Sequence, residues 1–372
     1  MSPAAVTPAI PAASTALAAR RRHGRIRLSA LAFLVVTAGV AALCIGPVAI
    51  DPPTVLRAMI AGLSGTGPAN TAELIVWTTR APRVGMAIIA GALLAVAGAV
   101  FQAMVRNGLA DPYLLGINAG ASTGAAMVVL VVGSGSALLF SAGALAGAVL
   151  AVLLVLGLSG VASTRGPLRI ILAGLAVGYA LNAATNFLVF SSDSPEAARS
   201  VLFWLLGSLA AVQPAGLAAT ALATVLLLAW LLTIAPTVDA LASGDDSARS
   251  VGIDPERSRL LLLTITSAAV GVGVAAVGGI GFVGLVVPHL ARALVGSRHR
   301  STLPAAALVG ALLLVGADTV ARTALAPMEI PVGVITGIVG APALLLLLRQ
   351  ASARSSRPRL ARLAPHPKGH TR

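Results

Sequence analysis

The sequence has few charged, aromatic, cysteine and lysine residues. Charged residues make up 10% of the 372-residue chain and aromatic residues 3%, whereas hydrophobic residues make up 57%. A soluble domain carries about 25% charged and about 45–50% apolar residues, so this chain could not cover a water-facing surface with polar side chains. The shortage of charge excludes a soluble enzyme and a disordered chain, and it predicts a protein that crosses a membrane several times.

Cysteine and lysine occur once each, and each scarcity excludes a kind of site. Because Cys44 is the single cysteine, an intramolecular disulfide and a CxxC metal site are excluded. Its place in an apolar run predicts a thiol packed as a small hydrophobic group. Lys368 lies in a polar segment and is followed by Gly369, so the chain has no G-x-x-x-x-G-K-[ST] phosphate-binding loop. If the function requires ATP, another subunit must bind the nucleotide.

Long uncharged apolar runs dominate what is present. The first, 28–50, is longer than the apolar region of about 7–15 residues in a cleavable signal peptide, so we expect it to be retained as a helix. With it we expect ten membrane-spanning segments in an all-α polytopic protein, the others being 84–105, 113–133, 136–159, 170–190, 215–234, 260–279, 281–296, 303–321 and 331–348. The apolar window 196–210 is too short to span and predicts a re-entrant or interfacial helix.

The basic residues predict the orientation. With ten spans and a cytoplasmic N-terminus, 21 of the 26 basic residues fall on the cytoplasmic side and 5 on the outside, as the positive-inside rule requires. The net charge of +14 is therefore typical of membrane topology rather than of nucleic-acid binding. We expect residues 1–27 to form a disordered cytoplasmic extension, 28–350 the transmembrane domain and 351–372 a basic cytoplasmic tail.

Glycines recur at every fourth position within the apolar runs, a spacing that lets membrane helices approach closely. Helix packing is the expected role, and a smaller share could line a substrate path. The spaced glycines are Gly116, Gly120 and Gly124; Gly143 and Gly147; Gly174 and Gly178; and Gly333 and Gly337.

Ionisable residues inside the membrane are costly and usually functional, and this chain has few. Asp318 lies within a span and Arg322 follows it by one helical turn, so the two are expected to pair. His289 is predicted at the opposite end of the membrane. This scarcity argues against a proton relay, although sodium coupling through backbone carbonyls stays open.

The longest predicted cytoplasmic loop, 235–259, contains a short amphipathic stretch from Ala240 to Val251, with Gly244 and Gly252 as its bounding glycines. A bare loop has no need of apolar residues at helical spacing, whereas a short helix that lies on a soluble partner does. A solvated loop helix is the alternative.

Four ordered stretches resemble the FecCD-type permease subunits of ABC importers for iron-siderophores, haem and cobalamin. They are RAPR at 80–83 with the AGALLAVAGAVFQAMVRNGLADPYLLGINAGASTGA segment; ILAGLAVGYALNAATNF with VLFWLLGSL; ASGDDSARSVGID; and GGIGFVGLVVPHLARALVG with GADTVARTALAPMEIPVGVITGIVGAP. The resemblance covers about residues 28–350. Gly108 departs from the family, which usually has proline there.

The resemblance implies a type II ABC importer permease fold without a nucleotide site, a catalytic residue or a cofactor. It implies as partners two cytoplasmic ABC ATPase subunits, a second permease copy or paralogue, and an extracytoplasmic substrate-binding protein, in a bacterial inner or plasma membrane with both termini cytoplasmic.

The resemblance also assigns roles to residues. An ATPase-coupling helix would comprise Gly244, Asp245, Asp246, Ala248, Arg249, Val251 and Gly252. Arg57 and Arg322 would dock the binding protein, with Arg80 and Arg83 as weaker candidates. Ser163 and Thr164 would lie at a cytoplasmic gate, and Asn182 and Asn186 would face the path or bond across helices.

An iron-siderophore is the expected cargo because it is the commonest in that family, and haem or cobalamin are the alternatives. An ion-gradient-driven secondary transporter is a rival of another class, and a membrane scaffold or receptor that transports nothing is a second.

Overall fold

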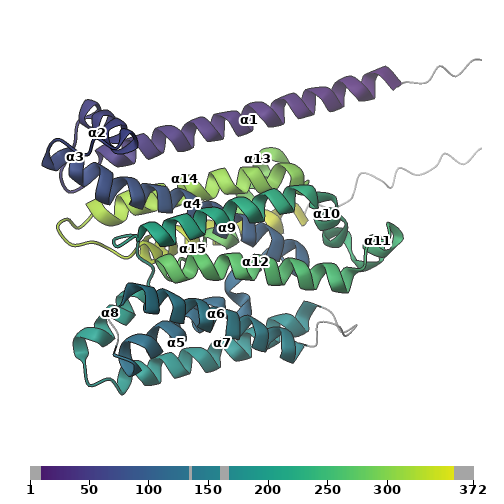
Figure 1. Cartoon of the computed structure of the whole chain (residues 1–372). Coiled ribbons are helices and arrows are strands. Elements are labelled where there is room, and N and C mark those ends of the chain that lie inside the picture. The colour runs from purple at the N-terminus through teal and green to yellow at the C-terminus, as the bar shows by residue number, and fades with distance from the viewer. Residues whose placement is uncertain (1–9, 134–135, 160–166, 356–372) are drawn as a thin grey trace, which may run out of the picture.

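The computed structural model describes residues 10–133, 136–159 and 167–355, and these residues form a bundle of helices joined by loops (Figure 1). Seven helices in the described part are long and apolar enough to cross a membrane, and three shorter apolar stretches lie at 117–131, 283–295 and 332–346. These ten elements correspond to the ten predicted segments. The main helices are α1 (Ile10–Cys44), α4 (Ala81–Val105), α5 (Ile117–Ala126), α6 (Ala137–Ser159), α7 (Pro167–Phe190), α9 (Pro214–Thr233), α12 (Pro255–Val277), α13 (Val283–Val295), α14 (His299–Thr323) and α15 (Val332–Ser355).

Short helices and turns occupy the connections. They are α2 (Pro52–Ser64), α3 (Thr71–Ile75), a π-helical turn (Val76–Arg80), a 3₁₀ turn (Pro112–Leu115), a second π-helical turn (Met127–Val131), α8 (Pro195–Leu205), α10 (Ala235–Ser243) and α11 (Asp245–Ser250). The short helix expected within 196–210 is α8. The sequence did not predict α2 or α3.

Two helices begin earlier than the apolar runs suggested. Helix α1 begins at Ile10, inside the extension that we expected to be disordered. The second span begins with α3 at Thr71 and runs through the π-helical turn into α4, so RAPR lies within a continuous helix of 35 residues rather than at its start. Helical backbone bonding continues past the apolar stretch because hydropathy marks only the membrane-buried part of a helix. Of the predicted basic tail at 351–372, residues 351–355 continue α15, and 356–372 lie outside the described residues.

The connecting helices lie at two opposite ends of the bundle. Helices α10 and α11 lie at one end, which we call the α10–α11 end, and α2, α3 and α8 lie at the other, which we call the α2–α3 end (Figure 1). Helix α4 runs between them through the middle of the bundle, and most of its side chains are buried.

Glycines allow the backbones of α5 and α6 to approach closely, because glycine has no Cβ atom to separate them. A Cβ atom on Gly120 would overlap the backbone of Gly147, and one on Gly124 would overlap the backbone of Gly143, so α5 and α6 meet at the predicted glycines. The helix-packing prediction is confirmed at these four positions. A Cβ atom on Gly178, by contrast, would have nothing within 4 Å of it, so a side chain there would meet open space, although the backbone N of Gly178 lies 3.7 Å from the position of a Cβ atom on Gly116.

Three loops meet at the α2–α3 end. The amides of Val332 and Gly333 donate to the carbonyls of Gly207 and Leu206, at distances of 3.0 and 3.1 Å. The amide of Ser208 donates to the carbonyl of Val277 at 2.9 Å. These bonds join the segment after α8 to the end of α12 and the start of α15.

Candidate functional site

Helices α10 and α11 form a short elbow whose corner is Gly244. The φ angle of Gly244 is 127°, a backbone conformation that glycine adopts readily because it has no Cβ atom and that other residues disfavour. A second glycine, Gly252, has a φ of 80° just after α11. The two glycines thus bound the six-residue helix Asp245–Ser250, as the sequence predicted for the loop.

One carboxylate ties this elbow to the bundle. Asp245 Oδ1 lies 2.7 Å from Nη2 of Arg259 in α12 and 3.8 Å from Nη2 of Arg106, which follows α4. Burial by itself raises the pKa of Asp245, but the hydrogen bond from Arg259 and the positive charges of Arg259 and Arg106 hold the pKa below its usual value. Asp245 is therefore an inward-facing anchor of α11.

A second anchor holds α10 to α14. The backbone N–H of His299 donates to Asp239 Oδ1 at 2.9 Å, and the Nδ1 atom of His299 lies 2.6 Å from the same oxygen. Burial raises the pKa of Asp239, and the bonds with His299 outweigh it and lower that pKa. No local pattern in the sequence points to this pair, because the two residues are 60 positions apart.

The outer surface of the elbow carries a different set of side chains. Asp246 and Arg249 are exposed and lie 3.5 Å apart, and Val251 is 64% exposed beside them. Ala248, on the opposite face of α11, is completely buried. The elbow therefore presents one acidic, one basic and one apolar group to its surroundings, on a helix fixed from behind.

The predicted docking arginines at the α2–α3 end occupy very different positions. Arg57 in α2 is exposed, and its guanidinium donates to Thr54 Oγ1 at 2.9 Å. Arg322 is only 3% exposed, and its guanidinium donates to the carbonyl of Ala42. Arg322 is therefore held inside the chain, where a docking protein cannot reach it.

Arg322 belongs to a buried charge cluster. Asp318 Oδ1 lies 2.8 Å from Nε of Arg83, and Asp318 Oδ2 lies 3.7 Å from Nε of Arg322. Arg83 also donates to Glu329, with both carboxylate oxygens 2.9 Å from Nη1. The predicted Asp318–Arg322 pair is present, but Arg83, from α4, is the closer partner of Asp318.

Two arginines complete the end of α1. The last carbonyls of a helix have no partner within the helix, and Arg80 donates to those of Leu43 and Cys44, at 2.7 and 3.1 Å. Arg322 serves the carbonyl of Ala42 in the same way. Arg80, which is 4% exposed, is therefore a structural residue like Arg322. The sequence could not place these bonds, because they join α1 to helices that follow much later in the chain.

The predicted path residues on α7 face outward. Asn182 and Asn186 are both exposed, whereas Thr185 between them is buried, with Oγ1 2.9 Å from that of Thr123 in α5. The exposed face of α7 also carries Tyr179 and Phe187. The asparagines therefore do not bond across helices within the described chain. Ser163 and Thr164 lie outside the described residues.

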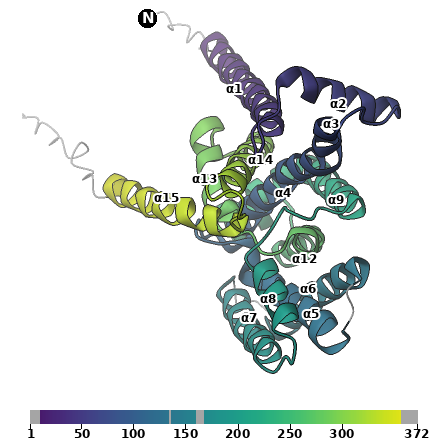
Figure 2. The same ribbon diagram turned by 90° about the vertical axis from the view of Figure 1, so that its left-hand side faces the viewer.

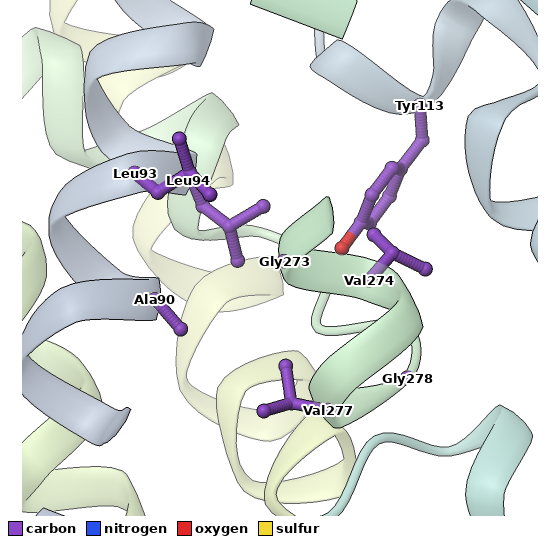
Figure 3. Close-up of a pocket in the computed structure, with 8 residues that line it drawn as sticks. All are labelled: Ala90, Leu93, Leu94, Tyr113, Gly273, Val274, Val277 and Gly278. Carbon is purple, nitrogen blue, oxygen red and sulfur yellow. The ribbon is translucent and has the colours of Figure 1, made fainter. Parts of the chain in front are cut away.

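A narrow apolar pocket lies between α4 and α12, and Tyr113 reaches into it (Figure 3). The Tyr113 hydroxyl donates to the carbonyl of Ile280 at 3.2 Å and accepts from its amide at 3.0 Å. With its hydroxyl occupied, Tyr113 fastens the loop after α12 rather than offering a polar contact to a ligand. Within the described residues, no three His, Cys, Asp or Glu side chains are grouped as a metal site would require.

Comparison with known proteins gives a consistent result. The model of the FecCD transport family matches residues 33–350. The cobalamin import system permease protein BtuC of Halobacterium salinarum is 38% identical over 294 residues, which cover 78% of this chain and 77% of that protein. The Fe(3+)-citrate import system permease protein YfmD of Bacillus subtilis is 36% identical over 280 residues, covering 75% and 82%.

The fold gives the same result. A solved structure described as an inward-facing conformation of a metal-chelate type ABC transporter superimposes with a TM-score of 0.76 and 29% identity, covering 87% of this chain and 98% of the solved one. The chain therefore belongs to the FecCD transport family of ABC importer permeases.

Proposed function

We propose that this permease moves an iron-siderophore complex into the cytoplasm, with the energy supplied by two ATPase subunits and the cargo delivered by an extracytoplasmic binding protein. The observation that carries the proposal is the elbow of α10 and α11: it is anchored to the bundle by Asp245 and exposes Asp246, Arg249 and Val251. A rigidly held element with an exposed mixed surface can receive a force and pass it to the helices behind it.

We assign the α10–α11 end to the cytoplasm. In the topology predicted from the basic residues, this end is the one that collects 21 of the 26 positive charges. The ATPases would then dock on the outer surface of α11. Gly244 and Gly252 would set the direction of α11, and the buried Ala248 would pack it against the bundle. The Asp245–Arg259 bond would transmit the motion of the ATPases to α12.

The binding protein would dock at the α2–α3 end. Arg57 is the candidate contact for an acidic group there, because its guanidinium is exposed and donates to the neutral hydroxyl of Thr54. Arg322 supports this surface from inside, by holding the end of α1. A charge at the exposed edge of an interface mainly raises the rate of association, and its contribution becomes smaller as salt is added.

The exposed face of α7 is the candidate path surface. Asn182 and Asn186 are too polar to be left facing lipid without a role, so we propose that a second permease copy or paralogue covers this face and that the path runs between the two. Ser163 and Thr164 would lie at the cytoplasmic mouth of that path.

The cargo is the least direct part of the proposal. A path with few charges suits a bulky chelate, which needs weak sliding contacts. The names of the two relatives point to cobalamin import and to Fe(3+)-citrate import. An iron-siderophore is our first choice, and haem and cobalamin are the alternatives within the same mechanism.

Uptake by cells tests the proposal. Cells that lack the gene should lose uptake of a labelled ferric siderophore under iron limitation, the wild-type chain should restore it, and the Arg249→Glu chain should not. Uptake that is unchanged by the deletion would contradict the siderophore assignment. Uptake that the purified chain supports without any ATPase would contradict the importer mechanism and favour an ion-gradient-driven transporter.

A further inference from the structure

Helix α2 runs crosswise to the spanning helices, next to α3 at the end of α1 (Figure 2). In the view along the bundle, α2 leaves the end of α1 sideways and runs over the outside of the bundle (Figure 2). Asp51 caps its first turn by accepting from the amide of Thr54, and Gly65, with a φ of 75°, ends it. The 13-residue helix is thus well defined, and it is oriented along the plane of a membrane that the other helices cross.

Three faces run along α2, each with its own character. Its buried face consists of Thr54, Val55 and Ala58. Leu56, Ile60 and Leu63, spaced by four and three residues, form an exposed apolar stripe on which each side chain is more than half exposed.

The third face is polar. Arg57 and Ser64 are exposed between the apolar stripe and Thr54 of the buried face, since successive residues turn by about 100° around a helix. The order around α2 is therefore protein, apolar stripe, polar face. A helix at the edge of a membrane protein meets three surroundings in that order: the protein beside it, lipid on one side and water on the other.

Exposed apolar side chains also precede and follow the stripe along the chain. The outer face of α1 carries exposed Val36 and Val40, and exposed Ile45 and Val48 follow between α1 and α2. Beyond α2, exposed Leu74 extends the surface onto α3. The stripe is thus flanked on both sides along the chain by other exposed apolar side chains.

A tryptophan lies at the same level. A Cβ atom on Gly62 would overlap the indole of Trp77, so the ring packs directly against α2. Trp77 is partly exposed, and tryptophan is enriched where one end of a side chain meets lipid and the other meets water.

We infer that α2 is an interfacial helix, with Leu56, Ile60 and Leu63 inserted into the lipid surface and Arg57 presented to water above it. Its partner is the phospholipid headgroup and acyl boundary, where such helices sink about 5–10 Å. The inference requires no cargo, ATPase or assignment of inside and outside. It gives α2 a second task if the proposed docking is right, because lipid contact would fix the height at which Arg57 stands.

Spin labelling in vesicles tests this directly. In a Cys44→Ala background, Ile60→Cys and Leu63→Cys place a nitroxide on the stripe, and Ser64→Cys places the matched control on the polar face. We expect labels at 60 and 63, in vesicles of phosphatidylethanolamine and phosphatidylglycerol, to collide several-fold more often with oxygen than with an aqueous nickel chelate. The label at 64 should show the reverse preference.

Two results would overturn the inference. Nickel collisions that are equal at 60, 63 and 64 would mean that the stripe faces water. A label at 60 that is open to nickel until the binding protein is added would mean that a protein covers the stripe. A label-free reading uses the chain with Trp204→Phe and Trp230→Phe, in which brominated lipids should quench Trp77 fluorescence; unquenched fluorescence would also count against lipid contact.

Discussion

The two ends of the bundle each contain a pair of an acid and an arginine, and the two pairs differ in solvent exposure. At the α2–α3 end, Arg83 and Arg322 surround Asp318, and all three side chains are almost completely buried. At the α10–α11 end, Asp246 and Arg249 pair at 3.5 Å with both side chains at least half exposed. Each end has an acid and an arginine one helical turn apart, yet the surroundings of the two pairs differ completely.

This difference shows that spacing alone does not reveal the role of a charge. A buried pair has lost its water and must stay paired, so it fixes structure. An exposed pair contributes little to stability and remains free to exchange its partner. At the α2–α3 end, Arg80 and Arg322 therefore hold α1, whereas at the α10–α11 end Asp246 and Arg249 stay available at the surface.

The largest expected effect comes from removing Asp318. Asp318→Asn leaves the buried guanidinium groups of Arg83 and Arg322 without their shared anion, and breaking a buried pair from one side costs about 3–5 kcal/mol. The purified variant should unfold at a clearly lower temperature than the wild type in the same detergent. A variant as stable as the wild type would show that the cluster does not hold this end together.

The next largest effect is expected at Asp245, whose exposure lies between that of the buried Asp318 and that of the exposed Asp246. Asp245→Asn weakens the charge-assisted bond to Arg259, and such bonds contribute about 1.5–3 kcal/mol. We expect α11 to become more susceptible to proteolysis while the rest of the bundle keeps its resistance. Equal cleavage rates in variant and wild type would contradict the anchoring role.

Acid should act on the same bond. Because the pKa of Asp245 is lowered in the folded chain, its stabilisation is fully present above the ordinary value of 3.8 and is lost as the pH falls through the lower folded pKa. Protease protection of α11 should therefore be constant from pH 7 to pH 5. Loss of protection within that range would mean that another group controls the elbow.

Docking at Arg57 should give a smaller effect. Arg57→Glu should reduce the affinity for the binding protein several-fold at low salt, and the difference from wild type should shrink as salt is added. The affinity can be measured with each permease variant in lipid nanodiscs, and Arg57→Gln serves as the control for loss of charge alone. Affinity that is the same in all three chains would remove Arg57 from the docking surface.

The smallest effect on stability is expected at Asp246. Asp246→Asn removes an exposed pair, so the unfolding temperature should stay close to that of the wild type, in contrast with Asp318→Asn. A loss of stability as large as that of Asp318→Asn would erase the distinction between the two ends.

Local patterns in the sequence predicted much of the fold. Apolar runs indicated the ten segments because hydropathy is a property of neighbouring residues, and four-residue spacing marked Gly120 and Gly147 as helix-packing glycines without predicting that they meet. The Asp318–Arg322 pair was visible for the same reason, since one turn of a helix separates the two residues.

Contacts between distant segments could not be predicted in this way. Arg83 is 235 positions from Asp318, and Arg322 is 280 positions from Ala42. The sequence therefore predicted an exposed Arg322 that could pair with Asp318 and dock a partner, whereas the tertiary fold turns it inward. Helix α2 was missed because its apolar stripe is too short to register as a span and its polar face interrupts the run.

The most direct test of the central claim is ATP-driven uptake in proteoliposomes that contain the permease and its ATPase, with Arg249→Glu compared with the wild type. Reversing the exposed charge should abolish most ATPase retention and uptake while leaving the unfolding temperature close to that of the wild type, because Arg249 is half exposed and an exposed pair such as Arg249–Asp246 contributes little to stability. Full uptake by Arg249→Glu, with the ATPase still bound, would contradict the claim that this surface couples the permease to its energy source.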